Sequence, residues 1–210
     1  LEPRQTYMDV NSVSPMTKKK VQDVIETAGA TFLEASILSP ILPHRHASPM
    51  LLSGPAASDV IKKLSPFGMH LTDTGPEFGR ASATKMFRSI IIKGLEALLQ
   101  ECVIAADRYD VADIVLDSIS SNHPEIDWKS LTDYYLGRSV LHGIRRGREM
   151  EEVADTLRSL NIEPLMAEAA AKRIHWLANR NLEQYFDGKH PNTYRDVLDA
   201  LSRQAMKKAG

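Results

Sequence analysis

The stretch Gly79-Arg80-Ala81-Ser82-Ala83-Thr84-Lys85-Met86-Phe87-Arg88-Ser89 divides the 210-residue chain into two parts with different sequence periods. From Ala81 onward, apolar residues recur with the 3.6-residue period of an α-helix. The apolar stripe runs from Met86 to Ala106, which predicts one helix of roughly 25 residues that needs packing partners on several sides. Further helices are predicted around 111–118, 128–139, 149–160, 164–180 and 193–207. Breaks are predicted at 122–124, 143–147, 163–164 and 188–191.

Before this stretch, strand and helix patterns alternate, which favours an α/β layer. Strands are predicted at Tyr7–Val10, Thr31–Leu38, Ser48–Ser53 and Met69–Thr72, and helices at Lys18–Ala28 and Ser58–Leu64. Four short strands are too few for a complete doubly wound domain. The sequence therefore predicts an α/β plus all-α protein, with an incomplete α/β lobe over residues 1–79 and a helical domain over residues 80–210.

Composition and charge exclude several classes of function. The net charge of −1 and the pI near 6.7 supply no general field to hold nucleic acid or an anionic membrane. No stretch approaches the roughly 18 apolar residues that a membrane span needs. The N-terminal residues Leu1-Glu2-Pro3-Arg4 contain no signal-peptide core, so we expect a cytoplasmic protein whose first residue marks a cut in a longer sequence. Cys102 falls in the helical apolar pattern and is predicted to be a buried core residue rather than a nucleophile.

Two segments near the α/β lobe could carry chemistry. Asp9-Val10-Asn11-Ser12-Val13-Ser14-Pro15 lies between a strand end and a helix start, where Ser14 can cap the helix or backbone N–H groups can bind an anion. Lys85, Arg88 and Ser89 share one helix face by their spacing. Lys85 could exchange a proton with a substrate oxygen if burial lowers its pKa, or it could be a solvated lysine on the first turns of the helix.

Two further segments contain basic residues. The segment His142-Gly143-Ile144-Arg145-Arg146-Gly147-Arg148 is read either as a group of arginines that fork onto a carboxylate or phosphate, or as a solvated turn between helices. The segment His44-Arg45-His46 is not expected to bind a metal, because Arg45 repels a cation and no acidic or thiol ligand lies nearby.

Taken in order, these motifs resemble the β-hydroxyacid dehydrogenase superfamily, which includes 3-hydroxyisobutyrate and 6-phosphogluconate dehydrogenases. The nearest likeness is to a branch known only as NAD(P)-dependent oxidoreductases with a 6-phosphogluconate dehydrogenase-like helical domain. The resemblance runs from Tyr7 to Arg180. It rests on Asp9-Val10-Asn11-Ser12-Val13-Ser14-Pro15 for a D-x-S-T-x-x-P-like motif, on Ala35-Ser36-Ile37-Leu38-Ser39-Pro40 for an A-P-V-S-G-G-like motif, on Lys85 for the lysine that opens the interdomain helix, and on His142-Gly143-Ile144-Arg145-Arg146 with Glu149-Met150.

The resemblance implies roles for these residues. Lys85 would be the catalytic acid/base, and the family's asparagine is replaced by Arg88 and Ser89. In a truncated member, a hydroxyl or His142 near Lys85 could assist it. Substrate would be bound by Asn11, Ser12, Ser39, Arg88, Ser89, Arg145 and Arg146. Family members begin with a glycine-rich turn that binds the pyrophosphate of NAD(P). This sequence has no G-x-G-x-x-G, so its α/β lobe is expected to be a partial Rossmann-like lobe. No cofactor is expected for the chain itself, and NADP or NAD only if a missing segment is supplied.

Three functions follow from the resemblance as expectations. The first is a truncated family member that has lost NAD(P) binding and performs cofactor-independent acid/base chemistry of the isomerisation, cyclisation or decarboxylation type. The second is a fragment of an NAD(P)-dependent hydroxyacid dehydrogenase, and the third is a non-catalytic dimeric binding module. A homodimer and a small-molecule substrate with a carboxylate or carbonyl group are expected, without nucleic acid or membrane partners.

Overall fold

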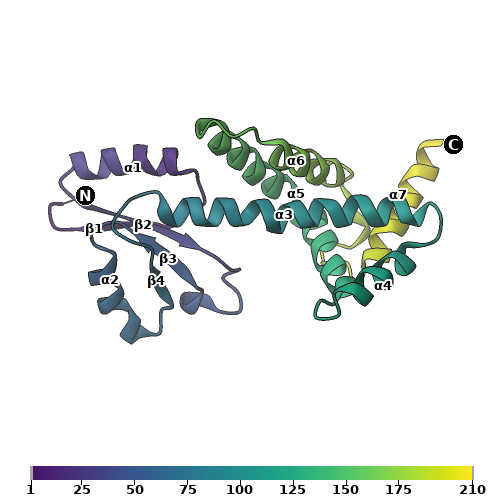
Figure 1. Cartoon of the computed structure of the whole chain (residues 1–210), viewed down its shortest axis with the longest axis horizontal. Coiled ribbons are helices and arrows are strands. Elements are labelled where there is room, and N and C mark those ends of the chain that lie inside the picture. Colours follow the sequence, from purple (N-terminus) through teal and green to yellow (C-terminus); the bar gives the residue numbers. More distant parts are fainter. Residues whose placement is uncertain (1, 210) are drawn as a thin grey trace. The chain divides into compact units, whose positions relative to one another are not determined.

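The computed structural model describes residues 2–209 and divides the chain into two compact units, which we treat separately (Figure 1). The α/β unit comprises the chain up to Ser89 together with Asp155–Ile162. The helical unit comprises Ile90–Ala154 together with the chain from Glu163 onward. Helices α3 (Arg80–Asp107) and α5 (Trp128–Ser159) contribute residues to both units. The domain boundary at residues 79 and 80 stays a prediction.

The α/β unit is built on one mixed sheet, and the four predicted strands are confirmed. The strands are β1 (Thr6–Asp9), β2 (Thr31–Ile37), β3 (Met50–Ser53) and β4 (Leu71–Asp73), in the order β1-β2-β3-β4. The pairs β1–β2 and β3–β4 are parallel, and β2–β3 is antiparallel. The other elements of this unit are α1 (Pro15–Thr27), α2 (Ala57–Leu64) and the short 3₁₀ helices Arg45–Ala47 and Ser65–Phe67.

The two faces of this sheet are covered by different helices, because successive side chains of a strand point to opposite faces. Leu33 and Leu52 are fully buried in a cluster with Ala57 of α2. Phe32, the neighbour of Leu33, packs instead with Ile25 of α1. Figure 1 shows α1 and α2 on opposite sides of the sheet. The α1 face is the one that also receives the start of α3, as described below.

The helical unit has its own apolar core, which confirms the prediction of a largely helical second part. Besides the long helices it contains α4 (Ala112–Asn122), α6 (Leu165–Ala178), the 3₁₀ helix Leu182–Tyr185 and α7 (Tyr194–Ala209). Its most deeply buried members are Val103, Leu116, Leu136, Leu177, Leu182 and Val197. Within residues 2–209, no helix has the length and hydropathy required to cross a lipid bilayer.

The predicted break at residues 143–147 is wrong, because α5 continues through it as one helix of 32 residues. The glycines there answer a packing requirement. A Cβ atom on Gly143 would lie 2.6 Å from the Cβ of Ala178 in α6, and one on Gly147 would lie 2.4 Å from the His175 ring. Glycine costs a helix about 1 kcal/mol relative to alanine, and at these positions it permits the close approach of α6.

Candidate functional site

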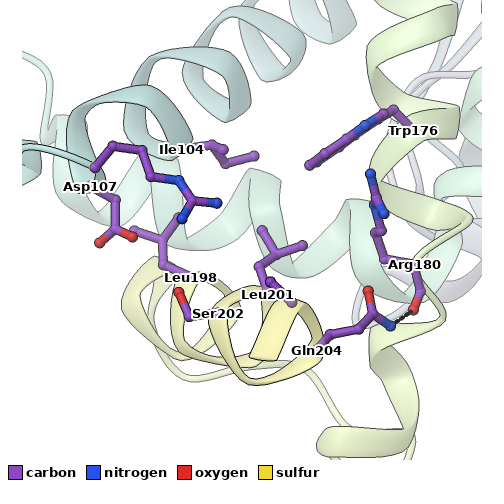
Figure 2. Close-up of a pocket in the computed structure, with 10 residues that line it drawn as sticks. Ile104, Asp107, Trp176, Arg180, Leu198, Leu201, Ser202 and Gln204 are labelled. Atoms are coloured by element: carbon purple, nitrogen blue, oxygen red, sulfur yellow. Dashed lines mark hydrogen bonds between the residues drawn. The ribbon is translucent and has the colours of Figure 1, made fainter. Parts of the chain in front are cut away.

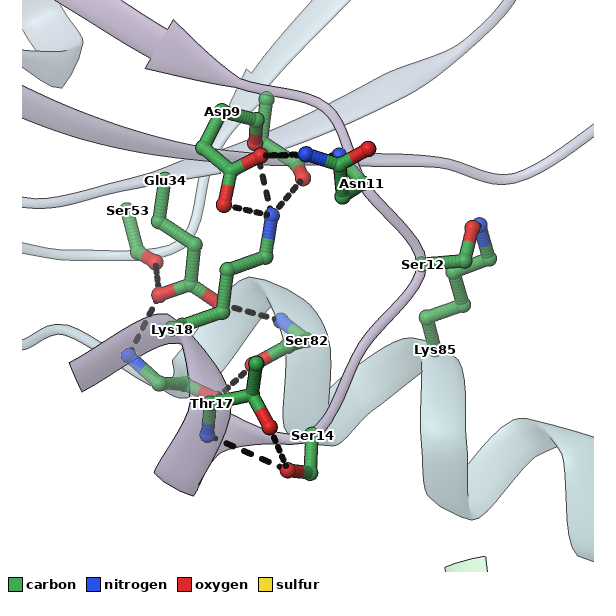
Figure 3. A network of polar contacts seen from close by, with 12 residues as sticks. Asp9, Asn11, Ser12, Ser14, Thr17, Lys18, Glu34, Ser53, Ser82 and Lys85 are labelled. Carbon is green, nitrogen blue, oxygen red and sulfur yellow. Dashed lines mark hydrogen bonds and ion pairs between the residues drawn. The ribbon is translucent and has the colours of Figure 1, made fainter. Parts of the chain in front are cut away.

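Three buried polar residues form a row across the sheet of the α/β unit (Figure 3). The strand register pairs Asp9 with Glu34 and Glu34 with Ser53, and none of the three is more than 1% exposed. Directly opposed residues on neighbouring strands point to the same face of a sheet. The row therefore lies on one face, where it meets α1 and the start of α3.

Asp9 is held by Lys18 of α1, which is itself 1% exposed. The Lys18 Nζ lies 3.1 Å from Asp9 Oδ2 and donates a hydrogen bond of 2.8 Å to the backbone oxygen of Asp9. Burial lowers the pKa of Lys18, and the hydrogen bond and charge of Asp9 oppose this shift. The other oxygen of the Asp9 carboxylate accepts from the backbone N and from the Nδ2 of Asn11, at 3.0 and 2.7 Å. The ion pair therefore fixes the loop that follows β1.

Glu34 holds the first turn of α3. Its Oε1 accepts from the backbone N of Ser82 at 2.6 Å, and its Oε2 accepts from the backbone N of Gly79 and, at 2.7 Å, from the hydroxyl of Ser53. The Ser53 Oγ accepts in turn from the backbone N of Ala81 at 3.3 Å. These N–H groups have no partner within the helix, and a carboxylate also suits the positive end of the helix dipole. The helix that carries Lys85 is thereby anchored to the sheet.

Lys85 meets the loop after β1. Its Nζ donates a hydrogen bond of 2.5 Å to the Oγ of Ser12, which is 73 positions away in the sequence. Figure 3 shows the two side chains adjacent, between the loop and the first turns of α3. Ser14, on the same loop, accepts from the backbone N of Thr17 at 3.2 Å and is the N-cap of α1, as predicted. Ser14 therefore caps α1, whereas Ser12 contacts Lys85.

The remaining predicted residues of this unit have weaker links to Lys85. Ser89 donates from its Oγ to the backbone oxygen of Lys85 at 3.1 Å, one helical turn earlier. Arg88 is exposed on the same helix. Ser39 follows β2 and donates to the carbonyl of Pro40 at 3.3 Å. Their contacts with substrate stay predictions.

In the helical unit, the predicted residues are divided between a cleft and the interior. His142 and Arg145 line a cleft of about 420 Å³ between α5, the end of α6 and the following 3₁₀ helix, together with Arg148, Asn181 and Glu183. Burial lowers the pKa of His142, and the charges of nearby arginines on α5 add to this shift. The neutral imidazole is therefore favoured.

Arg146 points into the interior of the helical unit. Its side chain is 8% exposed and forms an ion pair with the fully buried carboxylate of Glu96 on α3. The Arg146 Nε lies 3.0 Å from each carboxylate oxygen, and its Nη2 contacts Oε2. A contact between Arg146 and a substrate would require this buried ion pair to break, so the structure favours a role in packing.

A second pocket in the helical unit, of about 130 Å³, lies among the ends of α3 and α6 and one face of α7 (Figure 2). Arg180 lies over the ring of Trp176, 4.3 Å from its centroid, and the Nε2 of Gln204 donates to the backbone oxygen of Arg180 at 2.7 Å. Arg108 and Asp107 also line this pocket. The carbonyl ends of two helices and one carboxylate offset the two arginines there, so the pocket has no clear charge preference.

Among residues 2–209 no group of three or more His, Cys, Asp and Glu side chains is arranged to hold a metal ion. Cys102 is half-buried on α3, and burial raises the pKa of its thiol. This environment is that of an unreactive thiol rather than a nucleophile. Lys18 and Glu34 were missed by the sequence analysis. A charged residue within the apolar strand Thr31–Ile37 is the signal that could have identified Glu34.

Comparison with known proteins identifies relatives over most of the chain. Residues 106–177 match a family model described as a domain of unknown function (DUF1932). A curated protein of Methanothermus fervidus, an uncharacterized 28.5 kDa protein in the 7S RNA 5′ region, is 32% identical over 163 residues, or 76% of this chain and 61% of that protein. The chain therefore spans about three fifths of the length of the curated relative that it matches.

Solved structures extend the comparison. A conserved hypothetical protein from Sinorhizobium meliloti 1021 is 36% identical, with a TM-score of 0.80, over 95% of this chain and 66% of its own. The conserved protein MTH1747, of unknown function and described as structurally similar to 3-hydroxyacid dehydrogenases, is 30% identical, with a TM-score of 0.72, over 89% of this chain and 69% of its own. A 3-hydroxyisobutyrate dehydrogenase from Salmonella typhimurium has a similar fold at 14% identity, with a TM-score of 0.65 over 95% and 70%.

Proposed function

This chain belongs to the β-hydroxyacid dehydrogenase superfamily, and from that premise we propose that its α/β unit transfers a proton to or from the oxygen of a hydroxy acid or carbonyl compound. The scaffold is dehydrogenase- or reductase-like, and we assign Lys85 to the position of the superfamily's catalytic lysine, as the sequence resemblance implies. The observation that supports the proposal most directly is the 2.5 Å hydrogen bond between Lys85 Nζ and Ser12 Oγ. It joins the two motifs that sequence analysis assigns to one substrate site.

The proposed chemistry follows from these groups. In enolisation, an ammonium at Lys85 gives a proton to the carbonyl oxygen while water takes a proton from the neighbouring carbon, so that the carbonyl becomes an enol hydroxyl, and an amine at Lys85 takes the proton back in the reverse direction. Ser12 holds the Nζ in place and can donate its own hydroxyl proton to the same oxygen. Asn11, fixed by Asp9, offers an amide to a second polar group of the substrate.

Neither of the two helix starts that follow β1 and β3 offers an open cradle for the pyrophosphate of a dinucleotide. The helix α1 begins with Pro15, which lacks an N–H, and its first turn is capped by Ser14. The turn before α2 has a glycine, Gly54, but a Cβ there would lie 2.5 Å from the Phe78 ring, so the space beside it is filled. We therefore derive no step through a nicotinamide. The version of the proposal that these residues complete alone is acid/base chemistry such as isomerisation, cyclisation or decarboxylation.

Hydride transfer is the alternative version, in which a nucleotide-binding segment completes an NAD(P)-dependent hydroxyacid dehydrogenase. Lys85 has the same proton-transfer role in both versions. A binding module without catalysis is the third possibility.

We also propose that the protein acts as a homodimer, because Ile91 and Leu98, seven positions apart on α3, are 71% and 57% exposed. Sedimentation of the purified chain tests this part of the proposal.

The test of the catalytic role combines cofactor binding with a substrate panel. Binding of NADPH and NADH is measured by calorimetry, and proton exchange and turnover of 2- and 3-oxo acids are followed by NMR in D₂O. We expect Lys85→Met to lower turnover by a factor of about 10² or more. The matched control is Lys19→Met, which removes an exposed lysine of α1.

Each outcome selects one version. Micromolar NADPH binding with Lys85-dependent reduction selects the dehydrogenase, and Lys85-dependent exchange without nucleotide binding selects cofactor-independent chemistry. Turnover that is equal in Lys85→Met and Lys19→Met would overturn the proposal. Absence of any turnover by a folded protein would favour the binding module.

A further inference from the structure

The cleft of about 420 Å³ in the helical unit is a second candidate for ligand binding, formed without any residue of the α/β unit. One wall is the middle of α5, and the other is the end of α6 with the 3₁₀ helix that follows. The close packing of Gly143 against Ala178 brings these two walls together. Its volume falls in the range of small-molecule sites, about 300–1,000 Å³.

Three basic side chains lie on the α5 wall, beside Val140, Leu141 and Ile144. His142, Arg145 and Arg148 follow one another at intervals of three residues, which places neighbours on adjacent helical positions. Arg145 forms an ion pair with Glu149, but that carboxylate is also 2.9 Å from the buried Nζ of Lys93. Arg148 is exposed and makes no ion pair with any residue between 2 and 209. The cleft therefore has more cationic than anionic groups on this wall.

We propose that this cleft binds a small molecule bearing a carboxylate or phosphate group, with Arg145 and Arg148 as the ligands of the anionic group and His142 as a hydrogen-bonding neighbour. Arginine suits this role because its planar guanidinium forms paired hydrogen bonds with both kinds of oxyanion. Asn181 and Glu183 on the opposite wall can accept hydrogen bonds from hydroxyl groups of the same molecule.

The electrostatic environment of His142 agrees with this assignment. Burial is the main cause that lowers the pKa of His142, and the positive charges of Arg138, Arg145 and Arg146 lower it further. Glu149 and Glu183 are the nearby carboxylates of the cleft and its border. The net electrostatic potential at the imidazole is positive, and an anionic ligand would make it less positive. Binding of an anion is therefore expected to raise the pKa of His142.

The pocket in Figure 2 does not share these properties. It is about 130 Å³ in volume, and Arg180 is stacked on Trp176 at the carbonyl end of α6. Positive side chains at such an end offset the negative pole of the helix. The arginines of the cleft, by contrast, belong to the middle of α5, and the end of α6 lies on the opposite wall.

The experiment is an NMR titration of the intact chain that follows the histidine Cε1–H signals. The probes are inorganic phosphate and malonate, which separate the two sources of an oxyanion, and choline chloride is the cationic control. We expect saturable binding of at least one anion and an increase in the pKa of His142. Arg148→Gln and Arg145→Gln should each weaken binding by roughly tenfold. Glu183→Gln, which removes a negative charge from the opposite wall, should strengthen binding.

The matched control is Arg203→Gln, because Arg203 is an exposed arginine of α7 that does not line the cleft. The proposal would be overturned if Arg203→Gln weakened anion binding as much as Arg148→Gln does. It would also be overturned if no saturable binding of an anion were observed. Lys85→Met should leave the titration unchanged, since the cleft is formed by the helical unit alone. Failure of this proposal is therefore separable from failure of the proton-transfer role of Lys85.

Discussion

The buried carboxylates of the α/β unit, Asp9 and Glu34, accept hydrogen bonds from backbone N–H groups as well as from side chains, whereas Glu96, the fully buried carboxylate of the helical unit, has side-chain partners. Glu34 accepts from the backbone N of Gly79 and of Ser82, and Asp9 accepts from the backbone N of Asn11. In the helical unit, Glu96 binds Arg146 and the hydroxyl of Ser139, while Glu149 binds Lys93 and Arg145.

The difference assigns separate tasks to the two networks. In the α/β unit the carboxylates fix two chain segments, namely the loop after β1 and the first turn of α3. Those segments carry Ser12 and Lys85, so the network acts on the geometry of the candidate site. In the helical unit the carboxylates connect residues of α3 and α5. Burial works to raise the pKa of Glu149, but Lys93 and Arg145 outweigh it, and the pKa lies below its usual value.

The largest effect is expected from breaking the Glu96–Arg146 pair. Arg146→Ala would leave the fully buried carboxylate of Glu96 without its cation, which typically costs about 3–5 kcal/mol of unfolding free energy. Both tryptophans, Trp128 and Trp176, lie in the helical unit, so urea unfolding followed by tryptophan fluorescence reports on this unit.

Two further variants test whether the effect belongs to the buried pair. Asp117→Ala breaks the exposed pair with Lys129 and should cost less than about 1 kcal/mol. The double variant Glu96→Leu with Arg146→Met replaces the pair by apolar residues and should recover most of the loss. Equal losses for Arg146→Ala and Asp117→Ala would contradict the interpretation of a buried pair.

An intermediate effect is expected from Glu34→Ala. This change removes the acceptor of two backbone N–H groups and of the Ser53 hydroxyl, and each unsatisfied buried donor costs about 1–3 kcal/mol. Because water can enter the space and satisfy part of this set, we expect a total of roughly 2–4 kcal/mol. Hydrogen exchange at the amides of Ala81 and Ser82 should accelerate, while exchange within α7 should not.

The conservative variant Glu34→Gln distinguishes the charge from the geometry. Its single amide oxygen can still accept from one or two of the donors, so the amide of Ser82 should exchange more slowly than in Glu34→Ala. Unchanged exchange in Glu34→Ala would show that the first turn of α3 is held by other contacts.

Much of this arrangement could be predicted from the sequence, and the remainder could not for identifiable reasons. The stripe from Met86 to Ala106 predicts α3, and Ser14-Pro15 predicts the start of α1, because both depend on local periodicity and capping. The partners of Glu34 lie 45 and 48 positions away. No local pattern encodes such a distance, so the row of buried polar residues appears only once the strand register is known.

The glycines of α5 also show where a local sequence rule fails. Gly143 and Gly147 were read as a break between helices, because glycine commonly ends a helix. Their actual role depends on α6, which lies about thirty residues later and approaches at these two positions. The local rule therefore predicted the end of a helix at glycines that instead allow two helices to pack closely.

The smallest effect, and the sharpest test of that role, compares two glycines of the helical unit. Gly143→Ala places a methyl group 2.6 Å from the Cβ of Ala178. Overpacking costs about 1–3 kcal/mol, and the gain in helix propensity returns up to about 1 kcal/mol, so a net loss of roughly 1–2 kcal/mol is expected. Gly94→Ala, in α3, meets nothing within 4 Å and should stabilise the protein by about 0.5–1 kcal/mol. Opposite signs in urea unfolding would assign the glycines of α5 to close packing, because propensity alone predicts the same sign for both.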